Sequence, residues 1–185
     1  MEIISFIGRP CAGKGTQIEL LKKKTGFPVM STGEMLRERA KKDDVLGRKI
    51  KDAFQEGKLH PTPVVFSLWM PFFLETKESD AEGVIMDGNP RKLYEAWMLE
   101  ELFEFLDWKD CWRVFYINIK EEDAYERMKK RAREHDSEEE IKSRLQWFNA
   151  EIVPVIDYFK EKGSLVEIDG EGTVEEVWER VKSNL

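Results

Sequence analysis

The sequence predicts an α/β fold in which a five-stranded parallel sheet carries helices on both faces. Short apolar runs rich in β-branched residues alternate with helical patterns, as in sheets that are covered on both sides. A glycine-rich turn joins the first run to the first helix, which is typical of doubly wound parallel sheets. With 185 residues, of which 41 % are hydrophobic, the chain can form a single domain with a sizeable core.

The expected strands are the five apolar runs, and glycine or proline residues mark where several of them begin or end. The runs cover residues 3–7, 29–30, 84–87, 114–119 and 165–168. All of them are short and apolar on both faces, so we expect each strand to be buried between two layers of helices.

Helical spacing fills the segments between the runs. The predicted helices cover residues 14–24, 34–42, 45–55, 93–106, 121–131 and 138–160, and a last helix follows the capping residue Thr173. Ser137 and Glu140 form a capping box at the start of the longest of these helices. Pro154 lies inside that helix, so we expect a bend there.

The stretch "PTPVVFSLWMPFFL" predicts a further helix with two prolines in different roles. Thr62 can act as the N-cap, and Pro63 suits the first helical position. Pro71 should kink or end the helix. We interpret the apolar residues of this stretch as core in preference to a self-association patch. We also expect most tryptophans to be core, among them Trp69, Trp97 and Trp147.

Two segments do not belong to the alternation of strands and helices, namely residues 32–79 and residues 131–137. Both follow the carboxyl end of an expected strand or of the helix after it. In parallel sheets of this kind, ligands bind beyond the carboxyl ends of the strands. We therefore predict that both segments are insertions placed over a ligand site.

The composition excludes several classes of protein. The net charge of −7 argues against bulk binding of nucleic acid or of an anionic membrane. Cys11 and Cys111 show neither metal spacing nor a disulfide framework, which favours a reducing compartment. The sequence contains no secretory signal pattern and no apolar run long enough to span a bilayer. We therefore expect a soluble, cytoplasmic protein, and a monomer is favoured over an oligomer.

The glycine-rich turn has the residues that bind phosphate. Gly8 and Gly13 are separated by four residues, and Lys14 follows directly. Backbone N–H groups of such a turn point at an anion, the following helix adds its positive end, and the lysine reaches the outer phosphates. The general pattern places Ser or Thr after the lysine. Here Gly15 intervenes, and the hydroxyl belongs to Thr16.

The sequence "GRPCAGKGTQ" at residues 8–17 resembles the phosphate loop of the adenylate kinases and related nucleoside monophosphate kinases. That family carries Gly-Thr-Gln after the lysine, so the departure from the general pattern becomes a match. The resemblance continues in family order over nearly the whole chain. It includes "STGEMLR" at 31–37, "GKLHP" at 57–61, "MDGNPR" at 86–91, "RMKKR" at 127–131, "DSEEEIKSR" at 136–144 and "VEIDGEGTVEEV" at 166–177.

The resemblance implies one kinase domain over residues 1–185, with an insertion at 32–79 that binds the nucleoside monophosphate and a lid at 131–137. It implies reversible transfer of the γ-phosphoryl group of ATP to AMP, with Mg²⁺ bound to ATP. The implied ATP-binding residues are Cys11, Ala12, Gly13, Lys14, Gly15, Thr16, Arg127 and Gly172. Thr16 and Asp87 would hold Mg²⁺ through water.

The resemblance also implies an acceptor site and a set of catalytic cations. The acceptor residues would be Thr32, Gly33, Arg37, Lys58, Leu59, His60, Gly88, Arg91 and Glu95. The catalytic residues would be Lys14, Arg91, Arg131, Arg133 and Arg144. Arginine suits this chemistry because its planar fork binds phosphate oxygens in pairs and keeps its charge. The lid is very short and lacks the four zinc-binding cysteines of some members, so no structural zinc is expected.

Because of Glu95, the sequence does not decide which base the acceptor nucleotide carries. AMP-specific relatives place a glutamine there, which offers adenine both a donor and an acceptor. An ionised glutamate only accepts hydrogen bonds and would suit guanine better, whereas Thr32 matches AMP-type members. Glu95 could also simply point to water. We favour AMP as the acceptor, with GMP, CMP or UMP as alternatives.

Two other classes of protein fit fewer features of the sequence. A nucleotide-binding factor with this fold and slow turnover would not need so many arginines around a transferred phosphate. A GTPase would need a guanine-binding Asn-Lys-x-Asp pattern, which the sequence does not show.

Overall fold

The computed structural model describes residues 1–56, 60–131 and 137–185 and contains a parallel sheet with the strand order β2-β3-β1-β4-β5. The strands are β1 (Glu2–Gly8), β2 (Val29–Ser31), β3 (Gly83–Asp87), β4 (Trp112–Asn118) and β5 (Leu165–Asp169). Each predicted apolar run is a strand of this sheet. The predicted fold class, a five-stranded parallel α/β sheet, is confirmed.

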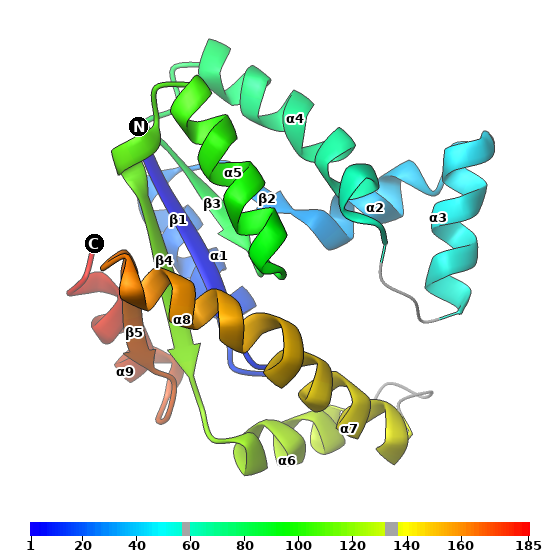
Figure 1. Cartoon of the computed structure of the whole chain (residues 1–185). Helices are drawn as coiled ribbons and strands as arrows, with labels where there is room; N and C mark the ends of the chain where they lie inside the picture. The colour runs from blue at the N-terminus through cyan, green and yellow to red at the C-terminus, as the bar shows by residue number, and fades with distance from the viewer. Residues whose placement is uncertain (57–59, 132–136) are drawn as a thin grey trace.

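The helices follow the strands in the order that the sequence predicts (Figure 1). They are α1 (Lys14–Thr25), α2 (Thr32–Arg39), α3 (Val45–Gln55), α4 (Thr62–Glu78), α5 (Leu93–Phe105), α6 (Glu121–Arg131), α7 (Glu138–Trp147), α8 (Val153–Glu161) and α9 (Val174–Lys182). A short 3₁₀ helix, η1 (Lys109–Cys111), precedes β4, and a π-helical segment, η2 (Phe148–Ile152), joins α7 to α8. Ser137 and Glu140 form the predicted capping box at the start of α7.

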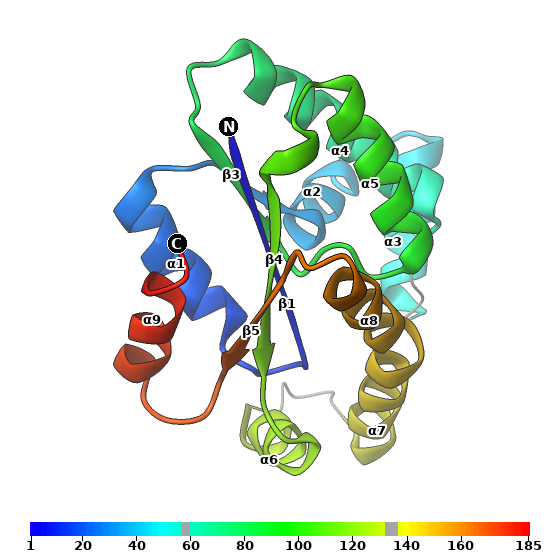
Figure 2. The ribbon, with the colours of Figure 1, turned by 60° about the vertical axis from the view of Figure 1, so that its left-hand side comes forward.

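Two apolar layers cover the two faces of the sheet. Figure 2 shows α1 and α9 on one side and α4, α5 and α8 on the other. The alternation of side chains along β1 sends Ile3 and Ile7 to the layer of α4, α5 and α8, and sends Ile4 and Phe6 to the layer of α1 and α9. Both layers contain fully buried residues, so β1 is the central strand of the core.

The carboxyl ends of the central strands meet at one edge of the sheet. The register pairs Gly8 of β1 with Ile117 of β4, and Phe6 of β1 with Asp87 of β3. The glycine-rich loop (residues 8–13) therefore begins beside the end of β3. In Figure 1 the helices α6 and α7 lie below this same edge.

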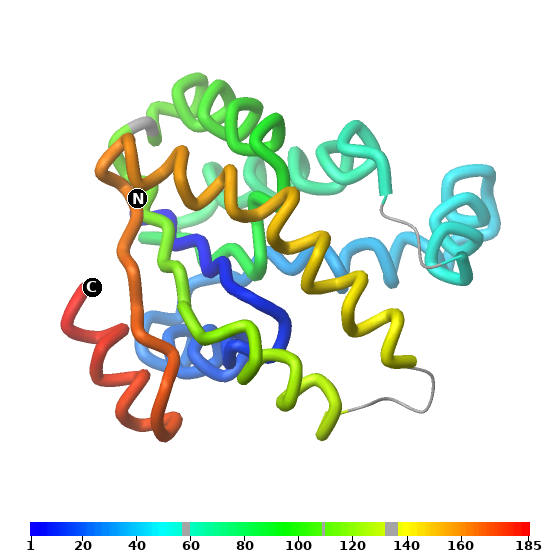
Figure 3. The backbone as a smooth tube through the Cα atoms, turned by 60° about the horizontal axis from the view of Figure 1, so that its bottom comes forward, coloured from blue at the N-terminus to red at the C-terminus, as the bar shows by residue number. Residues whose placement is uncertain are grey.

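Residues 32–79 form α2, α3 and α4, of which α3 lies farthest from the sheet (Figures 1 and 3). Helix α4 belongs to the core over the sheet through Trp69 and Phe73, which are fully buried. The indole Nε1 of Trp69 donates a 2.8 Å hydrogen bond to Oγ1 of Thr32. This bond fixes the start of α2 to the part of the segment that belongs to the core.

Pro61, Pro71 and Pro154 occupy different positions in their helices: one caps α4, one lies inside α4 and one lies at the start of α8. Helix α4 continues through Pro71 to Glu78, so the alternative that Pro71 ends the helix was wrong. Packing of the side chains on either side of Pro71 against the core keeps the helix intact. The N-cap position is held by Pro61, one residue before the predicted Thr62, and the side chain of Thr62 is buried. Ahead of Pro154, the helix is irregular in the π-helical segment η2, where i→i+5 bonding accommodates a proline that has no N–H.

The aromatic residues confirm the core interpretation of α4, whereas the core prediction for Trp97 of α5 was wrong. Phe66, Trp69 and Phe73 are buried. Trp97, which we expected in the core, is 47 % exposed, because α5 turns the side chains next to it in sequence toward the sheet and leaves this one outside. No helix within the described residues has both the length and the apolarity to cross a membrane.

Candidate active site at the carboxyl edge of the sheet

The glycine-rich loop is built from residues with unusual backbone conformations. Gly13, the N-cap of α1, has a φ of 93°, and Cys11 has a φ of 60°. Gly8 cannot be replaced without rearrangement, because a Cβ atom there would lie 2.5 Å from the carbonyl oxygen of Ile117. The loop thus turns tightly against β4 and presents the N-terminus of α1, which is a favourable place for an anion.

Lys14 folds back over this loop. Its Nζ donates hydrogen bonds to the carbonyl oxygens of Gly8, at 2.8 Å, and of Arg9, at 3.0 Å. The pKa of Lys14 is lowered to about 8, chiefly by burial and also by the charge of Arg91, while the nearby carboxylate of Asp87 opposes this shift. Lys14 is therefore a cation that is fixed at the turn and that loses its proton at a lower pH than an exposed lysine does.

A cavity of about 900 Å³, which we call the loop cavity, lies beside the glycine-rich loop. It is lined by Cys11, Ala12, Gly13, Lys14, Gly15, Thr16, Glu19, Leu20, Lys23, Asp87, Arg127 and Arg131. The fold thus brings the predicted loop residues together with Asp87 from β3 and two arginines from α6. Gly172 lies in the turn before α9, with a φ of 106°, and does not line this cavity.

A second cavity, of about 440 Å³, joins cations from three elements, and we call it the arginine cavity. It is lined by Ile7, Gly8, Pro10, Lys14, Gly88, Arg91, Ser143, Arg144, Trp147, Phe148 and Ile152. Lys14 lines both cavities and therefore lies between them. Arg91 is oriented by a 3.0 Å hydrogen bond from its Nε to the carbonyl oxygen of Gly88.

A smaller cavity continues from Arg91 toward the segment 32–79, and we call it the Glu95 cavity. It is lined by Thr32, Leu36, His60, Val65, Asn89, Arg91, Lys92, Glu95 and Trp147. Arg91 and Trp147 line this cavity as well as the arginine cavity. The arginine cavity thus has Lys14 in common with the loop cavity and Arg91 in common with the Glu95 cavity.

The same residues lie within a sequence that matches known proteins over most of its length. The sequence model of the family described as adenylate kinase matches residues 6–164. The chain is 35 % identical to the adenylate kinase of Leptospira biflexa over 181 residues, which cover 96 % of each protein. It is 36 % identical to the adenylate kinase of Corynebacterium urealyticum over 176 residues, covering 94 % of this chain and 93 % of that protein. It is 32 % identical to the adenylate kinase of Thermus thermophilus over 188 residues, covering all of this chain and 97 % of that protein.

The chain belongs to the adenylate kinase family. Adenylate kinases are ATP-dependent nucleoside monophosphate kinases, so the chain is a phosphotransferase of this class. The family resemblance expected from the sequence motifs is confirmed.

Glu95 is buried, although a glutamate on a helix is usually exposed to water. Its side chain is 5 % exposed, so the alternative in which it points to water was wrong. Its Oε2 accepts a 2.8 Å hydrogen bond from the backbone N–H of Arg91. Burial raises the pKa of Glu95, and the backbone hydrogen bond and the charges of Arg91 and Lys92 oppose that rise only in part. The adenylate kinase fold here places a carboxyl group with a raised pKa in the Glu95 cavity.

His60 lies in the same cavity but is held by other groups. Its Nε2 is 3.2 Å from the carbonyl oxygen of Ile50, and its ring meets the ring of Phe54 edge-on at 4.7 Å. These contacts tie the residue to α3.

The loop cavity contains oxygen ligands that suit Mg²⁺. The carboxylate of Asp87 lies at the end of β3, where its Oδ2 accepts a 3.2 Å hydrogen bond from Oγ of Ser31. The hydroxyl of Thr16 lines the same cavity. Mg²⁺ is commonly held by one or two carboxylates, water and substrate phosphates, so this pair of residues fits it. Among the described residues, no cluster of three or more His, Cys, Asp or Glu could hold a metal ion.

Not every predicted residue lines these cavities. Arg37 is exposed on α2, with its guanidinium against Gly33, where an added Cβ atom would lie 3.3 Å from Nη1. Neither residue lines the loop, arginine or Glu95 cavities. Lys58, Leu59, Arg133 and most of the predicted lid at 131–137 fall outside the described residues.

The sequence analysis missed two residues of the site. Trp147 lines two of the cavities, and its position three residues after Arg144 on a helix would have placed both side chains on one face. Arg9 lies inside the glycine-rich loop, and its side chain contacts β4 and η2. No local pattern identifies Arg9, because its partners Tyr116 and Phe148 lie 107 and 139 positions away from it in the sequence.

Proposed function

We propose that this chain reversibly transfers the γ-phosphoryl group of ATP to AMP and so forms two ADP. The observation that carries the proposal is the position of Lys14, which lines both the loop cavity and the arginine cavity. ATP would occupy the loop cavity, with its phosphates on the glycine-rich loop. The acceptor phosphate would lie in the arginine cavity, and its base in the Glu95 cavity, beside the segment 32–79.

The arrangement supports transfer because it places cations where two sets of phosphates would meet. Bringing two nucleotides together phosphate to phosphate is opposed by repulsion, so positioning and charge stabilisation are the main catalytic requirements. Arg91 and Arg144 line the same cavity as Lys14 and approach it from different elements. Arg127 and Arg131 line the loop cavity and extend the cationic wall along α6.

The reaction requires no general base from the protein. The second pKa of a phosphate monoester is about 6, so the acceptor oxygen is already ionised at neutral pH. Mg²⁺, bound through water to Thr16 and Asp87, would supply further neutralisation of the ATP phosphates. The protein's own task is to orient the phosphates and to exclude water, which would otherwise compete as the acceptor.

The acceptor base is read by Glu95 in this proposal. Adenine presents a donor at its exocyclic amine and an acceptor at N1. A protonated carboxyl group offers the complementary acceptor and donor, and the raised pKa of Glu95 favours that form. The relatives cited above are named adenylate kinases, which supports AMP. GMP is the second candidate, since an ionised Glu95 would accept hydrogen bonds from N1–H and the exocyclic amine of guanine.

The proposal also includes a monomeric, cytoplasmic enzyme that acts on small nucleotides. The net charge of −7 supports this, because it disfavours binding to polyanionic surfaces. Sedimentation at micromolar concentration tests the oligomeric state.

The deciding experiment measures ADP formation from ATP with AMP, GMP, CMP or UMP as the acceptor. We expect AMP to give the highest kcat/KM. Lys14→Met should lower turnover by roughly 10³-fold, in line with the loss of one transition-state cation. The matched variant Lys24→Met, which removes an exposed charge from the same helix, should retain the activity. Turnover too slow to measure in the wild type would favour the nucleotide-binding factor, and a higher kcat/KM with GMP would replace AMP as the acceptor.

A further inference from the structure

Arg9 makes an unusual set of contacts for a residue of a glycine-rich loop. Its side chain is 17 % exposed and does not line any of the three cavities. Nη1 donates a 3.2 Å hydrogen bond to the hydroxyl of Tyr116 in β4 and a 3.1 Å hydrogen bond to the carbonyl oxygen of Ile119 just after β4. The guanidinium is thus fixed to the strand next to β1.

The other face of the guanidinium contacts the helix that carries Arg144. The Cζ atom of Arg9 lies 4.9 Å from the ring centroid of Phe148, the first residue of η2. Phe148 is 2 % exposed and follows Arg144 by four positions, so both side chains lie on one face of the helix and line the arginine cavity. A cation over a buried aromatic ring contributes more than an exposed one, because water competes less.

A carboxylate joins the same group of residues. Oε2 of Glu121, at the start of α6, lies 4.0 Å from Nη2 of Arg9. The same oxygen accepts a 2.9 Å hydrogen bond from Nδ2 of Asn149 in η2. Arg9 therefore contacts α6 and η2 together, on the side of the arginine cavity from which Arg144 enters.

The backbone of Arg9 supports the other cation of the site. Its carbonyl oxygen accepts the 3.0 Å hydrogen bond from Nζ of Lys14. One residue thus holds Lys14 through its backbone and the helix of Arg144 through its side chain. A change in the position of Arg9 would move these two cations relative to each other.

We propose that Arg9 is a positioning residue that keeps Lys14 and the Arg144 helix in register, so that both cations reach the same phosphoryl group. The inference rests on the proposed phosphoryl transfer. Arg9 itself does not touch the nucleotides. Its loss should therefore lower kcat and leave the KM values for ATP and AMP within about twofold, because small misplacements of catalytic groups reduce the rate of the chemical step.

The test is a double-mutant cycle with Arg144. Arg9→Met should lower kcat roughly tenfold in the wild-type background. In the Arg144→Met background the same change should lower kcat less than about twofold, since the cation that Arg9 positions is already gone. Arg9→Lys keeps a charge near Phe148 but lacks the guanidinium fork, so it should restore part of the lost rate. Independent, multiplicative effects in the two backgrounds would overturn the inference.

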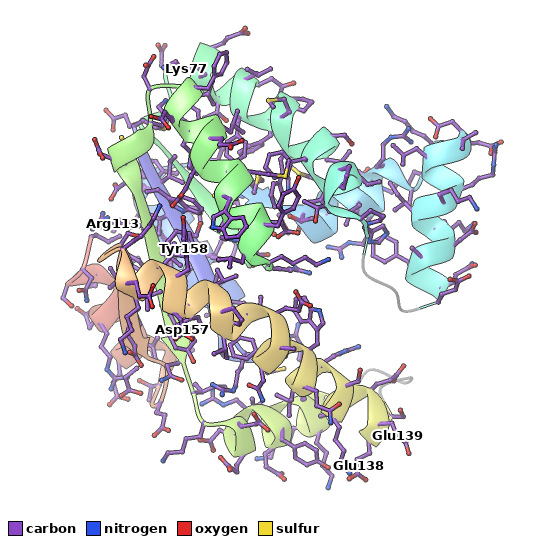
Figure 4. All side chains as sticks on the ribbon, in the orientation of Figure 1. Lys77, Arg113, Glu138, Glu139, Asp157 and Tyr158 are labelled. Atoms are coloured by element: carbon purple, nitrogen blue, oxygen red, sulfur yellow. The ribbon has the colours of Figure 1, made fainter. Side chains whose placement is uncertain are left out.

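Arg113 provides a matched control for the loss of a structural arginine. It lies on β4 with its Cζ 5.7 Å from the ring centroid of Phe115, and its Nη1 donates to the carbonyl oxygen of Asn184 at 2.6 Å. Figure 4 labels it near the beginning of β4, away from α6 and α7. Arg113→Met should change thermal stability and leave kcat unchanged. An equal loss of kcat in Arg113→Met and Arg9→Met would show that the effect of Arg9 is a general loss of stability, and the inference would fail.

A binding measurement separates this inference from the proposed function. Inorganic tripolyphosphate has no base or ribose to hold it, so its affinity depends on Lys14 and Arg144 acting on the same chain of phosphates and responds to their register more than the KM values for ATP and AMP do. This affinity can be measured by calorimetry in the same four proteins of the cycle. Absence of ADP formation by the wild type would refute the proposed function alone. Non-additive loss of tripolyphosphate affinity for Arg9→Met and Arg144→Met would still support the inference. Additive losses, or no binding in any of the four proteins, would overturn it.

Discussion

Lys14 shows how one residue links the local structure of the loop to the chemistry. The turn holds its Nζ against two carbonyl oxygens, and burial lowers its pKa to about 8. The lowered pKa means that the nucleotide-free protein loses this positive charge as the pH rises through about 8. A bound polyphosphate favours the charged form, so binding of a nucleotide should take up a proton in this range.

The prediction for Lys14 concerns ADP binding between pH 7 and pH 9. The affinity should fall with rising pH above about 8, approaching tenfold per pH unit if only the charged lysine binds. Calorimetry at pH 8.5 in two buffers with different ionisation enthalpies should detect proton uptake. Lys24→Met should show the same uptake, and Lys14→Met should show none. Uptake that persists in Lys14→Met would assign the proton to another group.

Glu95 illustrates a residue whose role depends on its protonation. Its pKa is raised by burial, so the neutral acid is present at a higher pH than for an exposed glutamate. Ionisation removes the only proton that it can donate to N1 of adenine. Because the neutral form is lost as the pH rises through the raised pKa, binding of AMP should weaken in the same direction.

The prediction for Glu95 compares Glu95→Gln with the wild type. A glutamine offers a donor and an acceptor at every pH, so the increase in the KM for AMP that follows ionisation of Glu95 should be absent, and the KM should be roughly tenfold lower than that of the wild type above the raised pKa of Glu95. Steady-state kinetics with AMP from pH 6 to pH 9 measures this. Glu101→Gln, on the exposed side of the same helix, should behave as the wild type. If Glu95→Gln kept the pH dependence of the wild type, Glu95 would not read the base.

Among the elements, α4 is held in place by packing more than by its backbone. Pro71 lies inside the helix and cannot donate an amide hydrogen bond. The fully buried side chains of Trp69 and Phe73 flank it, and Trp69 also donates to Thr32 at the start of α2. Tertiary burial therefore maintains a helix that local propensity would interrupt.

The prediction for α4 is that Pro71→Ala stabilises the protein. The exposed position leaves space for alanine, and restoring a helical N–H should raise the free energy of unfolding by about 1–3 kcal/mol. Pro63→Ala, in the first turn of the same helix, should change it by less than about 1 kcal/mol, because that N–H has no intrahelical partner. Urea unfolding measures both variants. Equal effects of the two substitutions would contradict this explanation.

At the scale of the whole molecule, the site lies between parts of the chain that are far apart in sequence. The arginine cavity is bounded by β1, by the turn after β3 and by α7 with η2, and the Glu95 cavity is bounded by residues of the segment 32–79. Figures 1 and 3 show α3 far from the sheet, at the outer end of that segment. Transfer to AMP in preference to water requires that such parts approach each other around both nucleotides.

The prediction for the whole molecule is a decrease in the radius of gyration when both sites are filled. Small-angle X-ray scattering with a bisubstrate diadenosine pentaphosphate should show this decrease. AMP alone should produce a smaller one. An unchanged radius with the bisubstrate bound would rule out closure of the segments 32–79 and 131–137.

The sequence by itself determined the features that depend on neighbouring residues. The spacing of Gly8, Gly13 and Lys14, the apolar runs and the capping box of Ser137 and Glu140 are local signals, so the sheet, the glycine-rich loop and most helix limits could be predicted. The order of motifs along the chain also indicated the family. These patterns are readable because each is a signal of spacing or composition within a few neighbouring residues.

The tertiary structure alone decided the features that depend on distant partners. It buried Glu95 beside Arg91, left Trp97 exposed, carried α4 through Pro71 and brought Arg9 onto Phe148. In each case the environment of the side chain is set by elements that the chain reaches only after many residues. The burial of these particular side chains, and the pKa shift of Glu95 that follows from it, arise from this long-range packing and could not be inferred from local spacing.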